Sequence, residues 1–281
     1  MAYKTLSMEE VVAFRRHLEA QERSAGTVEN YLRHVSAFAR WLDGRPVTKE
    51  NAAGWKGYLT GGKYRPATVN AMLASLNQFF LFTGRQDCRV KPLRLQRRLF
   101  REEDRELERE EYDRLLQTAQ QEGRERLALL LETICATGIR VSEVAYITVE
   151  AARQGQAEIF LKGKVRLILL PQKLCRKLLR YAKEQKTVSG EVFLTKNGNS
   201  LSRKQIWAEM KALCRRAGVA PSKVYPHNLR HLFARAFYRI TRDVAKLADV
   251  LGHSSIETTR LYLISTGAEH ARQMERMQLI R

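Results

Sequence analysis

Apolar residues at helical spacing dominate the first ninety residues. The clearest stripe is Tyr31, Val35, Phe38 and Leu42, which fall at positions i, i+4, i+7 and i+11. Ser, Thr, Gly and Pro separate such stretches, and Thr27 is expected to cap the helix that carries this stripe. The helices predicted here lie at 7–22, from Thr27 to Leu42, from Thr48 to Gly61, and from Pro66 onward. Four helices of this size predict one small all-α domain, placed at 1–90.

A longer, mostly helical pattern follows, and it contains two strands. Leu127 to Thr137 is the most apolar helix, and Gly138 ends it. The strand-like stretches Ala157–Leu161 and Val165–Leu170 flank a tight turn at Lys162-Gly163-Lys164. Further helices are predicted around 172–185, 202–217 and 227–239. The predicted fold class is mainly α, with a small antiparallel β-sheet on one edge of a second domain at 107–281.

A basic stretch without a sustained period joins the two patterns. It runs from Lys91 to Arg101 and contains Pro92, so we predict an interdomain linker at 91–106. Residues 101–113 then hold three arginines against eight acidic residues. Charge runs of this kind usually form a solvated face, and we expect this one to take no part in binding a partner.

The charge of the chain indicates a polyanionic partner. Its formal net charge is +20, and its pI is near 10.1. The four cysteines, Cys88, Cys135, Cys175 and Cys214, form no C-x-x-C pair and are typical of reduced thiols in a cytoplasmic protein. No apolar run reaches the length of a membrane span, and no His/Cys cluster has metal-binding spacing.

The polar residues that favour chemistry gather between Tyr225 and Tyr262. His227 and Arg230 are three residues apart and share a helix face. Gly252 suits the C-terminal cap of a short helix that ends at Leu251. Ser254 and Glu257 fit a capping box, which predicts a third helix that holds Tyr262 in its later part. The apolar residues expected on the buried face of the first helix are Leu229, Leu232, Phe233, Ala236 and Phe237.

These residues resemble the C-terminal half of the tyrosine recombinase (phage integrase) family. The resemblance rests on H-x-x-R at 227–230, on LGH at 251–253, and on a tyrosine nine residues after His253. Upstream, residues 136–143 (ATGIRVSE) resemble the TGxRxSE box of the family, and Lys162-Gly163-Lys164 resembles its lysine hairpin. The five motifs follow the order of the family over nearly the whole chain, and they look most like short, two-domain Xer-like and transposon integrases.

The resemblance implies an active site for breaking a DNA phosphodiester. Tyr262 would be the nucleophile, forming a covalent 3′-phosphotyrosyl link. Arg140 and Arg230 would grip the two non-bridging oxygens, and His253 would donate a further hydrogen bond to the same phosphate. His227 is a candidate general base for the phenol proton. For the acid that protonates the leaving 5′-oxygen, aligning the KG pair selects Lys162, which we prefer, whereas counting toward Arg166 selects Lys164.

The implied function is site-specific recombination of double-stranded DNA through a Holliday junction. The resemblance implies a homo-tetramer on paired sites, accessory DNA-bending factors, and neither a metal nor another cofactor. The role is either integration and excision of a mobile element or Xer-like resolution. Two rivals are type IB topoisomerase-like relaxation and an inactive DNA-binding regulator. The first domain looks like a core-binding (SAM-like) domain, whose exposed cations, among them Arg33, Arg40, Lys63 and Arg65, would meet phosphates.

The tail after Tyr262 has a helical pattern of its own. Thr266 and Glu269 fit a helix cap, which predicts a helix from Gly267 onward. Its narrow apolar stripe consists of Ala268, Ala271, Met274 and either Met277 or Gln278. Such a tail can fold back on its own domain, but the family suggests that it docks into a neighbouring subunit. We hypothesise that residues 267–281 act in trans, because Met-bearing stripes suit adaptable docking.

Overall fold

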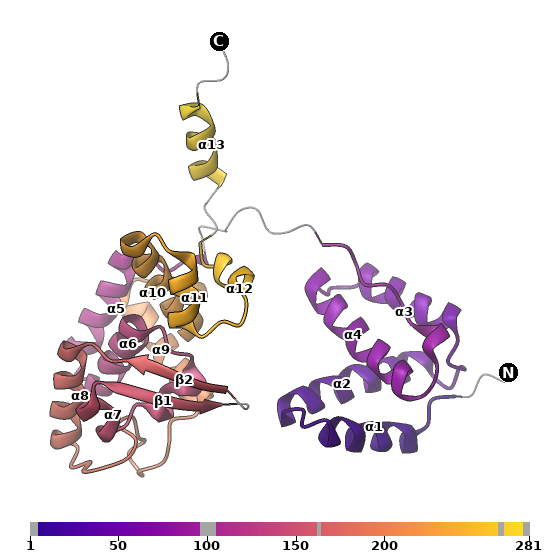
Figure 1. Cartoon of the computed structure of the whole chain (residues 1–281), viewed down its shortest axis with the longest axis horizontal. Coiled ribbons are helices and arrows are strands. Elements are labelled where there is room, and N and C mark those ends of the chain that lie inside the picture. The colour runs from indigo at the N-terminus through magenta and orange to yellow at the C-terminus, as the bar shows by residue number, and fades with distance from the viewer. Residues whose placement is uncertain (1–4, 96–104, 162–163, 264–266, 278–281) are drawn as a thin grey trace. The chain divides into compact units, whose positions relative to one another are not determined.

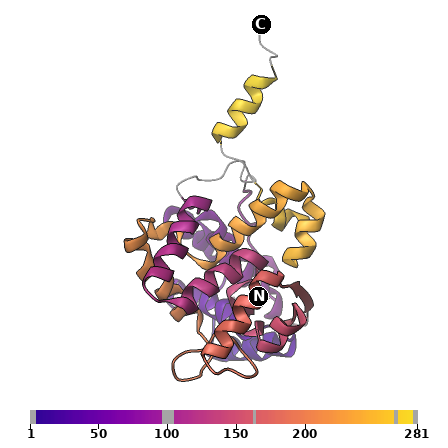
Figure 2. The same cartoon turned by 90° about the vertical axis from the view of Figure 1, so that its left-hand side faces the viewer.

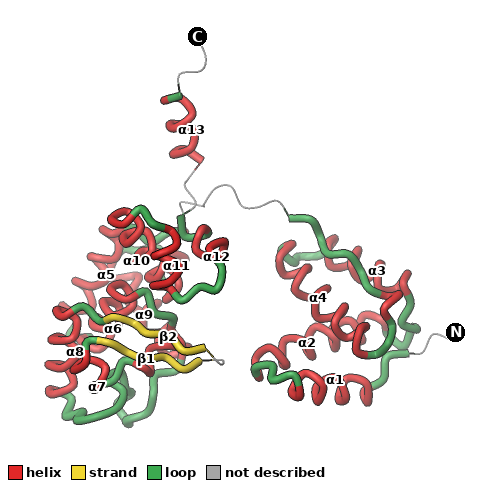
Figure 3. Tube along the Cα trace, viewed as in Figure 1, coloured by secondary structure: helices red, strands yellow, loops and turns green. Residues whose placement is uncertain are grey.

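In a computed structural model the chain divides into two compact units, Met1–Arg97 and Arg98–Arg281 (Figure 1). The structure describes residues 5–95, 105–161, 164–263 and 267–277. Helices form most of both units, with a small two-stranded sheet in the second (Figure 3). The prediction of a mainly α fold with a small antiparallel sheet is confirmed.

The described part of the first unit consists of helices and their short connections. Its elements are α1 (Met8–Ala20), α2 (Ala25–Leu42), α3 (Lys49–Gly61), α4 (Pro66–Phe82) and the 3-10 turn η1 (Gln86–Cys88). The prediction that Thr27 caps α2 is wrong, because the helix begins two residues earlier and Ser24 is its N-cap. The N–H of Thr27 already donates to the carbonyl of Ser24 within the first helical turn, at 2.7 Å.

Aromatic side chains fill the core of the first unit. Phe14, Phe38, Phe79 and Phe80 are fully buried, and Phe14 meets Phe79 edge to face with ring centroids 5.3 Å apart. The core extends into the stretch that was expected to begin the linker. Leu93 lies against this core, and its backbone exchanges two hydrogen bonds with the amide of Asn70, at 2.7 and 3.0 Å. Residues 91–93 therefore lie along the first unit, and residues 96–104 are outside the described residues.

The second unit surrounds a separate core. Its first half contains α5 (Arg109–Gln121), α6 (Glu125–Thr137), the 3-10 helix η3 (Val141–Tyr146), α7 (Val149–Gln154), β1 (Gln156–Leu161) and β2 (Lys164–Leu169). Its second half contains α8 (Gln172–Glu184), α9 (Arg203–Ala217), the 3-10 turn η4 (Pro221–Lys223), α10 (Pro226–Thr241), α11 (Val244–Leu251), α12 (Ile256–Arg260) and α13 (Gly267–Arg276). Helix α6 is buried along most of its length and contacts α5, α8 and α10.

The two strands form an antiparallel hairpin with a buried and an exposed face. Their register pairs Gln156 with Leu169 at one end and Leu161 with Lys164 at the other. Alternation along the strands places Ala157, Ile159 and Ile168 in the core. Arg166 lies on this inward face too, which is unusual for a cation, and its side chain is only 11% exposed.

Part of the acidic stretch 101–113 pairs with cations of the second unit, while Glu108, Glu110 and Asp113 stay exposed to solvent. Arg235 donates to a Glu108 oxygen at 2.8 Å and to the carbonyl of Leu107, which is itself fully buried. The carboxylate of Glu111 pairs with Lys223 at 2.9 Å. These charges therefore satisfy cations of α10 and η4 within the unit.

Helices α10, α11 and α12 gather at one end of the second unit in both views (Figures 1 and 2). The expected apolar face of α10 is confirmed at Leu229, which is fully buried, but Ala236 is exposed. Ala234, Leu247, Leu251 and Tyr262 form a small cluster apart from the main core. Among the described helices, none is both long and apolar enough to cross a bilayer.

Candidate active site

A buried arginine joins the ends of three elements. Arg230 lies in the second turn of α10 and is 1% exposed. Its guanidinium donates to the carbonyl of Gly138 at 2.5 Å and to the carbonyl of Leu251 at 2.7 Å. Neither carbonyl carries a formal charge, so the cation is solvated by the helix ends but not neutralised. Burial lowers the pKa of Arg230, while the nearby Tyr262 phenol opposes that shift.

Glycine is required at the end of α6, where the carbonyl of Gly138 accepts a hydrogen bond from Arg230. Gly138 caps α6 with φ of 64°, in the left-handed region. A Cβ at this position would lie 2.4 Å from the ring of Phe233 and 3.1 Å from Leu251. The glycine of the motif at 136–143 therefore has a steric cause, because only a residue without a Cβ lets α6 end this close to Phe233 and Leu251.

The second arginine of the predicted site, Arg140, is held by a carboxylate. It begins η3, and its guanidinium donates to Glu143 Oε1 at 2.7 Å while its backbone N–H donates to Oε2 at 2.8 Å. Glu143 is 3% exposed, whereas the Arg140 side chain is 42% exposed. The buried carboxylate thus fixes one edge of the guanidinium and leaves other donors facing solvent.

The turn after α11 brings His253 to Arg230. Gly252 ends α11 in the left-handed region, with φ of 62°, and the His253 N–H donates to the carbonyl of Ala248. The Nε2 of His253 lies 3.0 Å from Nη2 of Arg230, and its Nδ1 lies 2.8 Å from the hydroxyl of Thr259. Because a guanidinium can only donate, Nε2 accepts in this arrangement.

The electrostatics of the site keep its histidines neutral. Burial, followed by the charges of Arg230, Arg140 and Arg166, lowers the pKa of His253 to about 4. Partial burial of the ring, followed by the charges of Arg230 and Arg140, also lowers the pKa of His227, although the residue as a whole is exposed at the surface. At neutral pH both imidazoles are therefore uncharged, and His227 can accept a proton.

Tyr262 lies among three histidines. Its ring centroid is 5.6 Å from that of His227, 4.3 Å from that of His231 and 5.5 Å from that of His253. The residue is 6% exposed. The prediction that it lies in the later part of a helix is wrong, because α12 ends at Arg260 and Tyr262 follows in a turn.

The cap of α12 also differs from the prediction. Ser255, rather than Ser254, is the N-cap, and its hydroxyl accepts from the N–H of Glu257 at 3.2 Å. The helix therefore starts one residue later than the capping-box pattern indicates. The N–H of Tyr262 then donates to the carbonyl of Thr259 at 3.0 Å, which ties the tyrosine to the residue that contacts His253.

The structure brings Arg140, His227, Arg230, His253 and Tyr262 to one site, but it does not place the lysine. Lys162 lies outside the described residues. Lys164 begins β2, and its side chain is likewise not described. A hollow of about 930 Å³ adjoins the site, and its lining includes Arg140, Arg166 and His253. Among the described residues, no three His, Cys, Asp or Glu side chains form a metal-binding group.

Comparison with known families identifies this arrangement. The profile of the Phage integrase family matches residues 105–269, and the profile of the Phage integrase N-terminal SAM-like domain matches residues 11–87. The first match alone covers more than half of the chain. The chain belongs to the phage integrase family. It is thus a tyrosine recombinase, as its motifs led us to expect.

Two Xer recombinases are similar to this chain over most of its length. Tyrosine recombinase XerA of Pyrococcus furiosus is 28% identical over 290 residues, which cover 100% of this chain and 98% of the relative. Tyrosine recombinase XerD of Xanthomonas campestris pv. campestris is 31% identical over 268 residues, which cover 85% of this chain and 81% of the relative. Site-specific recombination is accordingly the activity of this chain.

Solved structures agree with the integrase fold. XerH site-specific recombinase bound to difH substrate, a pre-cleavage complex, has a TM-score of 0.68 at 20% identity, covering 95% of this chain and 84% of that one. A lambda integrase tetramer bound to a Holliday junction has a TM-score of 0.71 at 18% identity, covering 90% of this chain and 76% of that one. At these identities the likeness shows the fold alone.

The sequence motifs of this integrase gave no role to four residues of the site. Glu143 and Thr259 hold a predicted site residue each, and His231 packs against Tyr262 with its Nδ1 3.7 Å from Glu106. The fourth, Arg166, contacts Glu143 from β2. Glu143 had a signal in the TGxRxSE box, whereas the others depend on contacts between elements far apart in the sequence.

The steric demand at Gly252 predicts a selective defect. A Cβ there would lie 2.4 Å from Cδ of Arg166, in addition to the strain of a left-handed φ. Gly252→Ala should therefore slow formation of the covalent protein–DNA adduct by more than tenfold, measured with a nicked suicide duplex. Gly218→Ala is the control, because φ is 61° there and no atom lies within 4 Å of its Cβ. Both should lose about 1 kcal/mol of stability to strain, and equal cleavage rates for the two variants would contradict the prediction.

Proposed function

We propose that Tyr262 is the nucleophile with which this recombinase cuts and rejoins DNA. Its buried position among His227, His231 and His253, next to the buried Arg230, is the observation that supports this assignment best. Attack of the phenol oxygen on the scissile phosphorus would form the 3′-phosphotyrosyl bond and release the 5′-oxygen. Reversal of the same step by another 5′-hydroxyl would rejoin strands, which yields a Holliday junction after the first exchange.

Two arginines would stabilise the charge that develops on the phosphate. Arg140 keeps exposed donors beside a carboxylate that fixes its orientation, and Arg230 supplies a buried charge that the carbonyls do not neutralise. Preorganised donors of this kind are each worth ~10²–10³ in rate. The arriving phosphate would also favour the protonated form of His253, which would then donate from Nε2 instead of accepting there.

His227 is the proposed general base. Its pKa lies below its usual value because of burial and the two arginines, so it is unprotonated at neutral pH and able to take the phenol proton. The same group would return that proton during rejoining. His227 and Arg230 act from adjacent positions of one face of α10, so a single helix would supply both the base and the charge.

The partner proposed for both units is double-stranded DNA. On the first unit Arg33, Arg40, Lys63 and Arg65 are all exposed, as phosphate contacts require. We propose that this unit is the core-binding domain and that four copies assemble on paired sites with accessory DNA-bending factors. The site geometry is common to integration or excision of a mobile element and to Xer-like resolution. The cytoplasmic location stays a prediction.

Removal of one oxygen atom tests the nucleophile. Tyr262→Phe should bind a recombination site like the wild type and form no covalent adduct on denaturing gels, because the phenyl ring keeps the packing but lacks the attacking atom. Tyr238→Phe is the matched control, since this half-buried tyrosine packs on the same small cluster. An adduct that survives in Tyr262→Phe would show that another residue attacks.

A sulfur substitution tests the general acid. We propose that Lys162 protonates the leaving 5′-oxygen, and Lys164 is the alternative. A substrate with sulfur in place of that oxygen needs no acid, because a thiolate leaves without a proton. Lys162→Ala should therefore be impaired on the oxygen substrate and restored on the sulfur substrate, whereas Lys164→Ala should be little impaired on either. Restoration of Lys164→Ala alone would reverse the assignment.

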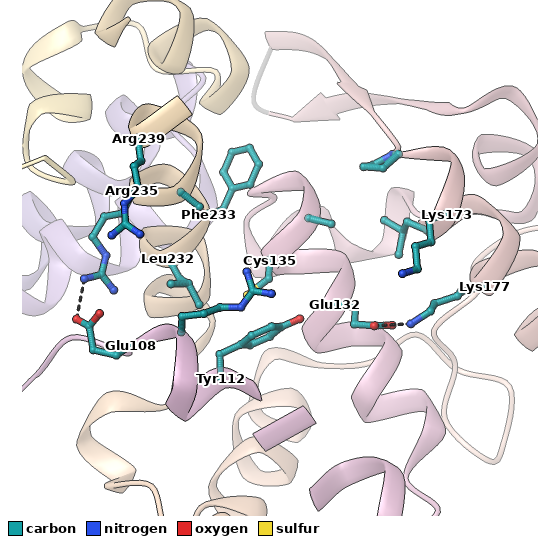
Figure 4. Close-up of a pocket in the computed structure, with 15 residues that line it drawn as sticks. Glu108, Tyr112, Glu132, Cys135, Lys173, Lys177, Leu232, Phe233, Arg235 and Arg239 are labelled. Atoms are coloured by element: carbon teal, nitrogen blue, oxygen red, sulfur yellow. Dashed lines mark hydrogen bonds and ion pairs between the residues drawn. The ribbon is translucent and has the colours of Figure 1, made fainter. Parts of the chain in front are cut away.

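A groove on the second unit fits the proposed trans-acting tail. It has a volume of about 380 Å³ and lies between α5, α6, α8 and α10 (Figure 4). Its apolar lining includes Tyr112, Leu232 and Phe233. Of the cations that line it, Lys177 and Arg235 pair with Glu132 and Glu108, as the dashed lines show.

Two further cations that line the groove are available to pair with an acidic side chain of a partner. Within the described residues, Lys173 and Arg239 line the groove and have no ion-pair partner. On α13 the side chains of Ala271 and Met274 are exposed, as is Met277 directly after the helix, and Glu275 lies between the two methionines in sequence. We propose that α13 of a second copy places these apolar side chains in the groove and Glu275 near Arg239.

Charge reversal tests this docking. Arg239→Glu and Glu275→Arg should each weaken recombination and assembly on paired sites severalfold, measured by gel shift, while binding to one site changes little. Combining the two reversals should restore assembly, because the pair regains opposite charges. Lys183→Glu, an exposed reversal at the end of α8, is the control for general loss of positive charge. Full assembly of a chain truncated after Thr266 would show that the tail is dispensable.

A further inference from the structure

Arg166 is a buried arginine for which the reaction proposed above has no role. It projects inward from β2, and its guanidinium bridges two other elements. One end, Nη2, donates to the carbonyl of Val250 at 2.8 Å. The other end, Nη1, lies 3.2 and 3.3 Å from the two oxygens of Glu143. Glu143 is the same carboxylate that holds Arg140 at 2.7 Å.

The fit around Arg166 is tight. The aliphatic part of the Arg166 side chain passes next to Gly252. A Cβ added at Gly252 would lie only 2.4 Å from Cδ of Arg166. Both ends of the guanidinium are occupied, and the side chain is 11% exposed, against 42% for Arg140. Both arginines line the hollow beside the site, but Arg140 offers a bound phosphate far more exposed surface than Arg166 does. Apart from the charge with which it helps to lower the pKa of His253, Arg166 can act on the reaction only through the groups that it holds.

We propose that Arg166 is a positioning residue that aligns Arg140 for the scissile phosphate. The carbonyl of Val250, in the last turn of helix α11, anchors one end of its guanidinium, and the other end fixes the Glu143 carboxylate between two arginines. With Arg166 in place, Glu143 is shared, and Arg140 keeps donors free for the phosphate. Without Arg166, the Glu143 carboxylate would be free to rotate and draw Arg140 toward itself. This role rests on the proposed function of Arg140.

The shared carboxylate also explains why an arginine is needed at this position. A planar guanidinium can contact a carbonyl at one end and a carboxylate at the other in a fixed geometry. A lysine at 166 would keep the positive charge but would present it as a single point. Arg166→Lys would therefore keep the positive charge but lose the two-ended contact, so this variant separates the effect of charge from the effect of alignment.

The test measures single-turnover adduct formation on suicide substrates with either oxygen or sulfur at the leaving position. Arg166→Met should slow both reactions about 10–100-fold, the range typical of partners one layer behind the reacting groups. Binding to a single site should stay within a few-fold of the wild type. Arg166→Lys should recover only part of the rate. Arg126→Met is the matched control, because Arg126 also bridges a carbonyl, of Leu194, and a carboxylate, of Glu209, away from the site.

A double-variant comparison distinguishes positioning from general support of the fold. In the Arg140→Ala background, Arg166→Met should lower the rate by less than threefold, because the group through which it acts is gone. If Arg166→Met does not fold, the same comparison uses Arg166→Lys. Wild-type rates for the single variant, a full multiplicative loss in the double variant, or restoration by the sulfur substrate would each overturn the proposal. Absence of any Tyr262 adduct in the unmodified protein would instead refute the proposed function.

Discussion

The buried charge of Arg230 is the constraint on which the site depends. Removing a guanidinium from water is unfavourable by several kcal/mol unless fixed dipoles replace the lost hydration. The carbonyls of Gly138 and Leu251 do this, and both lie where helices end, at or next to a left-handed glycine. The two glycine caps are therefore part of the electrostatics, because they point the backbone at the charge. The uncompensated positive charge favours an anion beside Arg230.

The same charge determines the protonation of the residues around it. His253 contacts Arg230 directly and has a pKa of about 4, so the free enzyme holds a neutral imidazole where the proposed mechanism calls for a donor. A phosphate placed among these cations would reverse the balance, because it adds negative charge next to His253. The free site is therefore prepared for its substrate electrostatically, and its donors are completed only when the phosphate is bound.

The short motifs predicted which residues lie together better than they predicted the local backbone. Arg140, His227, Arg230, His253 and Tyr262 come together because these motifs encode both the helix ends and the side chains beside them. Thr27 and Ser254 were mistaken for caps because neighbouring Ser and Thr residues satisfy the same pattern. The link from Arg166 to Glu143 spans 23 positions and two elements, so no local spacing could reveal it. The acidic segment likewise gave no sign of its ion pair with Arg235, which is more than a hundred residues away.

The position of Tyr262 offers a physical link between the proposed nucleophile and the proposed assembly. It is 6% exposed, yet only a few buried residues surround it, and the helix before it has five residues. Local rearrangement of so small a cluster is much less costly than opening the main core. Gly267, where α13 starts, is only five positions after Tyr262, a reach of at most about 18 Å. A neighbouring subunit that held α13 would therefore restrict where Tyr262 can lie, which gives the tail a direct physical means of coupling strand cleavage to a complete assembly.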